Sequence, residues 1–266
     1  MKKKISLPLC AQIISSPPHA RSIALVLCAL IMLMPLSACV SVNFSGFDTV
    51  AGTGEPVLYE FGFGEITFLD VSIYCDIVYY SELSENMPSG KVTLEIQENL
   101  MEHITLSESG GRLTVRSSKM LDTYGHKPTL TIYAPSLDRV ALSGAGDFTA
   151  HDKIEGYSFS ISLAGAGSAI AEFDVKELFA DISGAGEFYF SGTADKAEFN
   201  LSGAGDINAL YLETQMADIT LSGAGSVSVS CYEHLRLKAS GVGNVRYRGS
   251  PTTEISTSGL VSVTNE

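Results

Sequence analysis

Apolar and polar residues alternate along the C-terminal half of the chain in short runs that recur at nearly constant intervals. In each run, two apolar or small residues enclose a single residue that is polar in most copies. Alternation with a period of two residues predicts a β-strand with one buried face. The enclosing pairs, which we expect to point inward, are Val140 and Leu142, Ile161 and Leu163, Ala180 and Ile182, Phe199 and Leu201, Ile219 and Leu221, Leu237 and Ala239, and Ile255 and Thr257. The enclosed residues, which we expect to point outward, are Ala141, Ser162, Asp181, Asn200, Thr220, Lys238 and Ser256.

Each run leads into the phrase Ser-Gly-Ala-Gly or a close variant of it. The first glycines of successive copies are separated by 21, 19, 19, 20, 18 and 18 residues. Such a period indicates a repeat architecture, in which each unit buries its apolar face by stacking on its neighbour. The paired glycines are Gly144 and Gly146, Gly165 and Gly167, Gly184 and Gly186, Gly203 and Gly205, Gly223 and Gly225, and Gly241 and Gly243, followed by a degenerate copy at Gly259.

A further apolar position follows every phrase, and the repeat is too short to hold the crossover helix that parallel strands otherwise need. We therefore predict an all-β fold, a right-handed parallel β-helix with about seven rungs that are each marked by a Gly-Ala-Gly corner. The apolar positions after the corners are Phe148, Ala169, Phe188, Ile207, Val227, Val245 and Val261.

The glycines themselves are predicted to be structural. Stacked corners recur at the interstrand spacing of about 4.8 Å, so a side chain that pointed into the bend would collide with its neighbours. Glycine also permits a positive φ. The alternative is a phosphate-binding loop, but no copy completes Gly-x-Gly-x-x-Gly before a helical pattern.

Residues 56–133 also alternate in short strands, but they contain no Gly-Ala-Gly corner. Within them, residues 98–104 form the one plausible helical turn, residues 109–111 predict a hairpin-like turn, and residues 84–90 and 119–128 are typical of loops. This less regular section either continues the solenoid or caps it. A cap is expected, because an uncovered end rung exposes unpaired backbone groups.

Several segments resemble a known bacterial family, the putative auto-transporter adhesin head GIN domain. They are ENLMEHIT at 98–105, GGRLTV at 110–115 and APSLDRVALSGAGD at 134–147, followed by the repeated Ser-Gly-Ala-Gly phrases. The resemblance covers roughly residues 47–266. It implies a parallel β-helix on secreted or lipid-anchored proteins, but no established activity and no catalytic residues. We accordingly assign residues 56–266 to a head GIN domain, with regular rungs over 134–266.

The N-terminal segment has the features of a secretory signal. Residues 1–38 carry four basic residues and no acidic one, and a run of apolar residues over 23–34 leads to the sequence LSAC, which ends at Cys39. That ending resembles the bacterial lipobox, which implies that Cys39 becomes the lipidated first residue of the mature chain. An ordinary signal peptide is the alternative. Residues 40–55 then read as a tether. Because residue 40 is Val40, the best-known inner-membrane retention signal is absent, which leaves the outer membrane or the cell surface.

Charge and cysteine content restrict the partners. Without residues 1–38 the chain keeps 13 basic residues against 30 acidic ones. Such a surface repels nucleic acid and anionic head groups, so we expect no binding of nucleic acid, whereas cations or basic partners are possible ligands. Only Cys75 and Cys231 remain in the folded part, where buried free thiols are expected, although a disulfide is chemically possible. Nothing in the sequence indicates an oligomeric state.

The position directly after each corner is a candidate for chemistry. It is acidic at Asp147, Glu187 and Asp206, and a β-helix would stack these residues in one polar column. The preferred interpretation is structural, because a corner accepts any small polar residue that bonds to nearby backbone. Binding of Ca²⁺ and acid–base catalysis on a sugar are the alternatives. We predict no metal and no cofactor, since the histidines are isolated from other ligands.

No nucleophile with its base is found, so the sequence favours a protein that is not an enzyme. A solenoid offers long faces on which outward residues repeat at rung spacing, which suits binding of polysaccharides or other surface proteins. An adhesin-like binding module is therefore the first hypothesis. The alternatives are a structural envelope protein without a soluble ligand and a polysaccharide-acting enzyme on a β-helix.

Overall fold

The computed structural model of the chain describes residues 48–81 and 89–266, which are dominated by strands, at 71% strand against 2% helix. The residues Phe47–Glu266 form one compact unit. The predicted signal, Cys39 and residues 40–47 of the predicted tether lie outside the described residues. The prediction of an all-β fold is confirmed.

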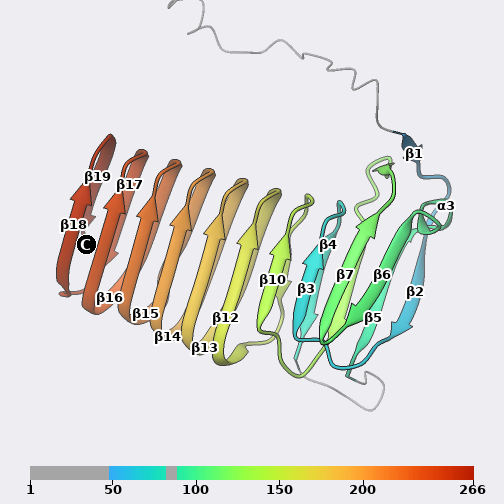
Figure 1. Cartoon of the computed structure of the whole chain (residues 1–266), viewed down its shortest axis with the longest axis horizontal. Helices are drawn as coiled ribbons and strands as arrows, with labels where there is room; N and C mark the ends of the chain where they lie inside the picture. Colours follow the sequence, from blue (N-terminus) through green and yellow to red (C-terminus); the bar gives the residue numbers. More distant parts are fainter. Residues whose placement is uncertain (1–47, 82–88) are drawn as a thin grey trace, which may run out of the picture. The chain divides into compact units, whose positions relative to one another are not determined.

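The regular part of the chain is a β-solenoid of about seven turns (Figure 1). In each turn the first wall leads into the Gly-Ala-Gly corner and the second wall follows it. The strands that build these turns are β10 (Arg139–Leu142), β11 (Phe148–Ala150), β12 (Ile154–Leu163), β13 (Ala166–Ile182), β14 (Ala185–Leu201), β15 (Ala204–Leu221), β16 (Ala224–Ala239), β17 (Val242–Arg248), β18 (Thr252–Thr257) and β19 (Leu260–Asn265). All of their pairings are parallel.

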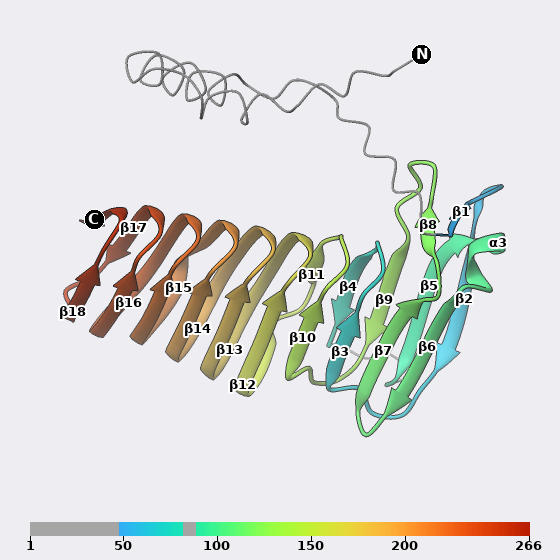
Figure 2. The same cartoon turned by 45° about the horizontal axis from the view of Figure 1, so that its top comes forward.

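Equivalent residues of successive repeats lie opposite each other. Gly167 pairs with Gly186, which in turn pairs with Gly205. The repeats identified from the sequence are therefore stacked turns. Where the register is kept, each residue of a wall meets its counterpart, so these positions form columns that run along the solenoid. Figure 2 shows the stacked turns from a second direction.

The return from the second wall to the next first wall is itself strand in the middle turns. β13, β14 and β15 continue for 17, 17 and 18 residues through the second wall, the return and the following first wall. Differences in repeat length are absorbed by register shifts, for example between Ala209 and Glu213 of β15. This arrangement gives the return backbone the ladder hydrogen bonds that a loop would lack.

The less regular N-terminal section both continues the solenoid and caps it. β3 and β4 form a turn that pairs in parallel with β10 and β11, and β7 and β9 form the next turn outward. β2, β5 and β6 pair antiparallel at this end. The bounds are β2 (Pro56–Gly62), β3 (Phe68–Val71), β4 (Asp76–Tyr80), β5 (Lys91–Gln97), β6 (Ile104–Ser109), β7 (Arg112–Ser117) and β9 (Thr129–Tyr133).

The smaller elements agree with the sequence at two places and correct it at one. The helical turn is present as α3 (Glu98–Met101), and Gly110 and Gly111 form the turn between the antiparallel strands β6 and β7. The segment 119–128, expected to be a loop, contains β8 (Met120–Asp122). β8 pairs with β1 (Thr49–Ala51), which lies within the predicted tether. Residues 84–88 of the other predicted loop, 84–90, lie outside the described part of the chain.

The core consists of the inward columns, and nearly all of them are buried as the alternation predicts. Phe159, Phe173 and Phe190 stack along it, with ring centroids 5.2 and 5.1 Å apart. Burying one such side chain contributes about 1.5–3 kcal/mol. Ile255 and Thr257 were expected to point inward, but both are exposed, Ile255 at 44%. They belong to β18, which pairs with β16 on one side, so their side chains have a neighbouring turn on that side alone among the described residues.

Candidate functional site

The glycine corners form a column in which consecutive turns touch backbone to backbone. A Cβ atom added at any first or second glycine of the six paired copies would lie 1.6–2.0 Å from a carbonyl oxygen of the preceding turn. The corner amides are also engaged. Gly184 donates to the carbonyl of Leu163 at 3.0 Å, and Ala185 donates to that of Gly165 at 2.9 Å. These N–H groups therefore bond to the solenoid itself and are not available to a phosphate group.

The polar positions after the corners lie in one column. Asp147 lies beside Ser168, which is in register with Glu187 and then Asp206. Asp147 accepts hydrogen bonds from the amide and hydroxyl of Ser168, each at 2.8 Å, and Asp206 accepts one from the amide of Ser226 at 2.6 Å. The carboxylates of Asp147 and Asp206 thus bridge to the backbone of the next turn.

This polar column begins one turn earlier than the sequence suggested, at Asp76. The carboxylate of Asp76 accepts a hydrogen bond from the amide of Asp147 at 2.8 Å. The Lys127 ammonium lies between the two carboxylates, 2.5 Å from Asp76 and 2.9 Å from Asp147. Burial acts to raise the pKa of Asp147, but hydrogen bonds from Lys127 and Ser168 outweigh it and lower that pKa. The pKa of Lys127 is raised by the same two carboxylates against the opposing effect of burial.

Glu187 and Asp206 form a second pair of acidic residues on adjacent turns of this column, and no lysine or arginine forms an ion pair with either of them within the described residues. The Glu187 carboxylate accepts a short hydrogen bond from the hydroxyl of Tyr189, which helps to raise the pKa of that tyrosine. Ca²⁺ requires six to eight oxygen ligands. The described residues contain no group of three or more His, Cys, Asp or Glu side chains arranged to hold a metal ion.

A second feature lies on the outer face of the first wall, over β12. Its outward residues are Ser158, Ser160 and Ser162. The central one, Ser160, lies in register between two bulkier side chains, Arg139 on one side and Phe179 on the other. Phe68 follows beyond Arg139. The result is a pair of adjoining depressions of about 360 and 600 Å³ that share Phe68, Arg139, Ser160 and Phe179. We call this feature the serine groove.

One side of the serine groove is built by stacked cationic and aromatic side chains. The Arg112 guanidinium lies 4.0 Å from the ring centroid of Phe68, and that of Arg139 lies 5.4 Å from the same centroid. Each such contact contributes about 0.5–1 kcal/mol at an exposed site. Within the described residues no acidic side chain forms an ion pair with Arg139, so its N–H donors are left to solvent or a ligand.

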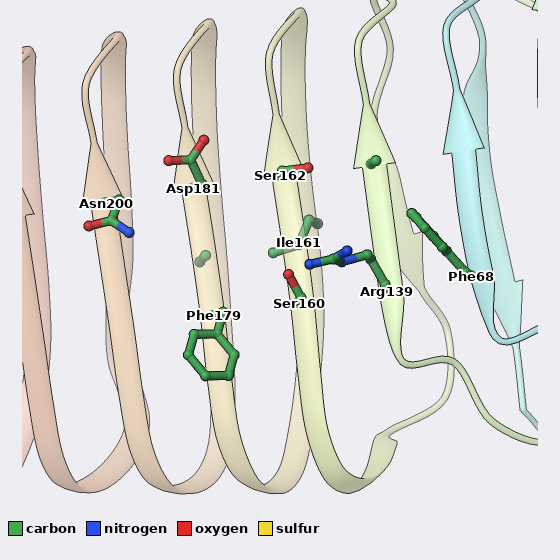
Figure 3. Close-up of a pocket in the computed structure, with 10 residues that line it drawn as sticks. Phe68, Arg139, Ser160, Ile161, Ser162, Phe179, Asp181 and Asn200 are labelled. Atoms are coloured by element: carbon green, nitrogen blue, oxygen red, sulfur yellow. The ribbon is translucent and has the colours of Figure 1, made fainter. Parts of the chain in front are cut away.

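The other side of the serine groove combines an aromatic ring with two polar side chains. Phe179 and Asp181 both lie on the outer face of β13, and Asn200 follows in register on β14. Figure 3 shows the Phe179 ring face-on from outside the wall, with Arg139 reaching toward Ser160. Burial raises the pKa of Asp181, and no hydrogen bond or ion pair engages its carboxylate within the described residues. The groove therefore offers unengaged donors and acceptors beside an open ring face.

Part of this surface was expected from the sequence. The predicted outward set of Asp181, Asn200, Thr220, Lys238 and Ser256 does form one column. The second outward column, two residues earlier on each strand, was missed, and it contains Phe68, Arg139, Ser160 and Phe179. The signal for it was the apolar Phe179 at a position where strict alternation calls for a polar residue.

The two cysteines of the folded part are free and buried. Burial is the main cause that raises the pKa of Cys75, to about 12, and it also raises that of Cys231. A buried thiol with a raised pKa is a poor nucleophile. The prediction of buried free thiols is thus confirmed, and neither cysteine lies in the serine groove.

A family model described as "Putative auto-transporter adhesin, head GIN domain" matches residues 82–251. Solved structures share the fold. A putative adhesin from Bacteroides fragilis has a TM-score of 0.76 at 21% identity, covering 82% of this chain and 100% of that one. A putative adhesin from Parabacteroides merdae has a TM-score of 0.62 at 20% identity, covering 82% and 99%.

A third solved structure is described as a putative lipid binding protein, from Parabacteroides distasonis. Its TM-score is 0.60 at 20% identity, and the match covers 82% of this chain and 98% of that one. The comparison with curated proteins found no match. Among the helices of the described residues, none is long and apolar enough to cross a membrane.

Proposed function

Because the chain belongs to the putative auto-transporter adhesin head GIN domain family, we propose that it is a binding module of the bacterial cell envelope. In this proposal a lipid on Cys39 anchors the chain in the outer membrane or at the cell surface. The solenoid then presents its outer face to polysaccharides or to proteins of another surface. Membership in an adhesin family supports a surface or extracellular location.

The serine groove is the observation that carries the binding role. It lies on the outer face of the first wall and is bordered by strands from four turns. Its volume falls within the range of roughly 300–1,000 Å³ that ligand sites occupy. Its side chains include an open aromatic ring and polar groups with free hydrogen-bonding capacity. A protein that acts only as a structural spacer needs neither this aromatic ring nor these unpaired polar groups on the outer face of the first wall.

Catalysis at the serine groove has less support than ligand binding without turnover. Each of its two depressions is lined by a single carboxylate, Asp181 in one and Asp138 in the other, and no histidine or cysteine accompanies them. Catalysis on a glycoside uses a pair of carboxyl groups at a defined separation. We therefore propose binding without turnover as the function.

The anchor is argued from the sequence alone, because Cys39 lies outside the described residues. A lipobox-like ending after an apolar run supports covalent lipid attachment. Two or more acyl chains on one cysteine hold a protein stably in a bilayer, whereas a single chain gives marginal binding. The acidic surface of the chain does not favour attachment through anionic head groups.

The test uses bacteria that produce the full chain, with Cys39→Ser as the matched variant. We expect metabolic labelling with a fatty-acid analogue to mark the parent and not the variant. Parent cells should bind at least one member of a panel of immobilised polysaccharides, mucin and matrix proteins. Cells lacking the protein should not bind it. Release of sugar products would identify an enzyme instead, and absence of binding to every panel member would refute the adhesin-like role.

A further inference from the structure

We infer that the serine groove binds a neutral sugar residue of a polysaccharide. The sugar ring lies on the open face of Phe179, and its hydroxyl groups bond to Arg139 and Asp181. This inference rests on the proposed function, because it names the ligand class for the same surface. It goes further by assigning the recognising residues and by excluding acidic sugars.

The Phe179 ring supplies the platform. Figure 3 shows its ring face-on from outside the first wall, and its side chain is partly exposed and lines both depressions of the groove. The face of an aromatic ring is negative and attracts weakly positive C–H groups. A pyranose ring presents several C–H bonds on one side, so it matches this platform. The neighbour of Phe179 toward the groove is Ser160, which is too small to obstruct a ring that lies there.

The polar groups around the platform match hydroxyl groups. A hydroxyl both donates and accepts hydrogen bonds. Arg139 can only donate, the ionised Asp181 can only accept, and the groove serines can do both. Arg139 and Phe179 lie on strands β10 and β13, which β12 separates, so they are two strand spacings or roughly 10 Å apart. A ligand about the size of one sugar ring with its substituents can therefore reach both.

Charge selects a neutral ligand within this class. The guanidinium of Arg139 and the carboxylate of Asp181 bring one positive and one negative charge to the same depression. A neutral polyol can bond to both groups. An acidic sugar would face Asp181 at close range and Asp138 in the adjoining depression. Beyond them lies a chain that without residues 1–38 has 30 acidic residues against 13 basic ones, and this field opposes polyanions. Polyuronates and sialylated chains should therefore bind weakly.

The absence of tryptophan from the sequence allows a direct readout. Phe179→Trp keeps an aromatic platform and introduces the chain's single tryptophan into the serine groove, where its emission can be excited selectively over that of the tyrosines. The full chain carrying this change, purified from membranes in detergent, is titrated with neutral oligosaccharides from glucans, galactans and mannans. Oligogalacturonate and a sialylated oligosaccharide form the acidic arm, and a mucin-derived peptide without sugar forms the protein arm. We expect a saturable emission change with at least one neutral series, and at least tenfold weaker binding in the other arms.

The matched control is Tyr189→Trp. Tyr189 is an exposed aromatic residue of β14, but it follows the corner and so lies on the second wall. Its emission should not respond to the sugar. An equal response from this variant would overturn the assignment of the site, and so would equal binding of the acidic series or preferential binding of the peptide.

Two further variants separate the site from the proposed function. Phe179→Ala should weaken binding roughly tenfold, as expected for loss of one stacked ring. Ser160→Phe fills the floor of the groove at an outward strand position, so it should abolish binding while the melting temperature stays near that of the parent. If the parent binds a surface polymer and neither variant changes its affinity, the inference fails and the proposed function stands. If the parent binds no polymer or surface protein, both fail.

Discussion

The glycine corners lead to a quantitative prediction, which is best tested at Gly203 in the middle of the solenoid. A Cβ atom at this position would lie 1.9 Å from the carbonyl oxygen of Gly184. An ordinary C···O contact is about 3.3 Å, so Gly203→Ala forces a separation of roughly 1.4 Å between the two turns. The same oxygen accepts the hydrogen bond from Ala204 at 2.9 Å, and this bond cannot survive such a displacement.

The expected loss of stability follows from these two effects. Overpacking in a tightly packed region costs about 1–3 kcal/mol. One backbone hydrogen bond contributes a net 0.5–1.5 kcal/mol. Gly203→Ala should therefore lower the free energy of unfolding by about 2–4 kcal/mol, a large part of the 5–15 kcal/mol that is typical of a folded domain.

The assay is urea unfolding followed by circular dichroism, in which the midpoint shifts and the slope is compared with that of the parent. Gly62→Ala is the matched control, since a Cβ there has no atom within 4 Å and the φ angle is not in the positive region. It should change stability by less than about 0.5 kcal/mol. Equal midpoints for Gly203→Ala and the parent would refute the close-approach explanation of the repeat.

Two further predictions concern titratable groups. The lowered pKa of Asp147 means that its contribution to stability is present above its ordinary value of 3.8 and is lost as pH falls through the lowered value. Lys127→Met should therefore reduce the melting temperature at pH 6, by an amount equivalent to less than about 1 kcal/mol because the pair is partly exposed, and the difference should shrink below about pH 4. A difference that stays constant from pH 7 to pH 3 would contradict this. Cys75 and Cys231 should resist alkylation at pH 8 in the folded chain and react after unfolding in urea, as followed by peptide mass spectrometry, because burial raises the pKa of both. Rapid labelling of either thiol in the folded chain would show that it is accessible.

The solenoid could be predicted from the sequence because every turn imposes the same requirements. An inward position such as Phe199 must be apolar, and a corner position such as Gly203 must lack a side chain. These requirements produce a periodic pattern in the sequence that can be recognised without a structure. The pattern in the N-terminal section is weaker. β3 and β4 precede β7 and β9 in sequence but lie between them and β10 and β11 in space, which no local pattern encodes.

The serine groove could not be predicted in the same way, since it depends on which outward side chains become neighbours. Ser160 and Phe179 are 19 residues apart and meet only because their strands pair in register. Arg139 and Ser160 are 21 residues apart. Once the register is known, the groove follows from side-chain size, since the small Ser160 lies between the guanidinium of Arg139 and the ring of Phe179.

The same reasoning explains where differences between related chains should reside. The solved structures share this fold at 20–21% identity. The stacking of turns constrains the corner and inward residues. A substitution at one of them lowers the free energy of unfolding by an amount similar to that calculated for Gly203→Ala. Outward residues face no such constraint, and most surface substitutions alter stability by less than about 0.5 kcal/mol. Ligand specificity can therefore change through the outward columns while the solenoid is retained. The ligand of this chain must accordingly be identified from its own groove residues, because shared architecture does not transfer it.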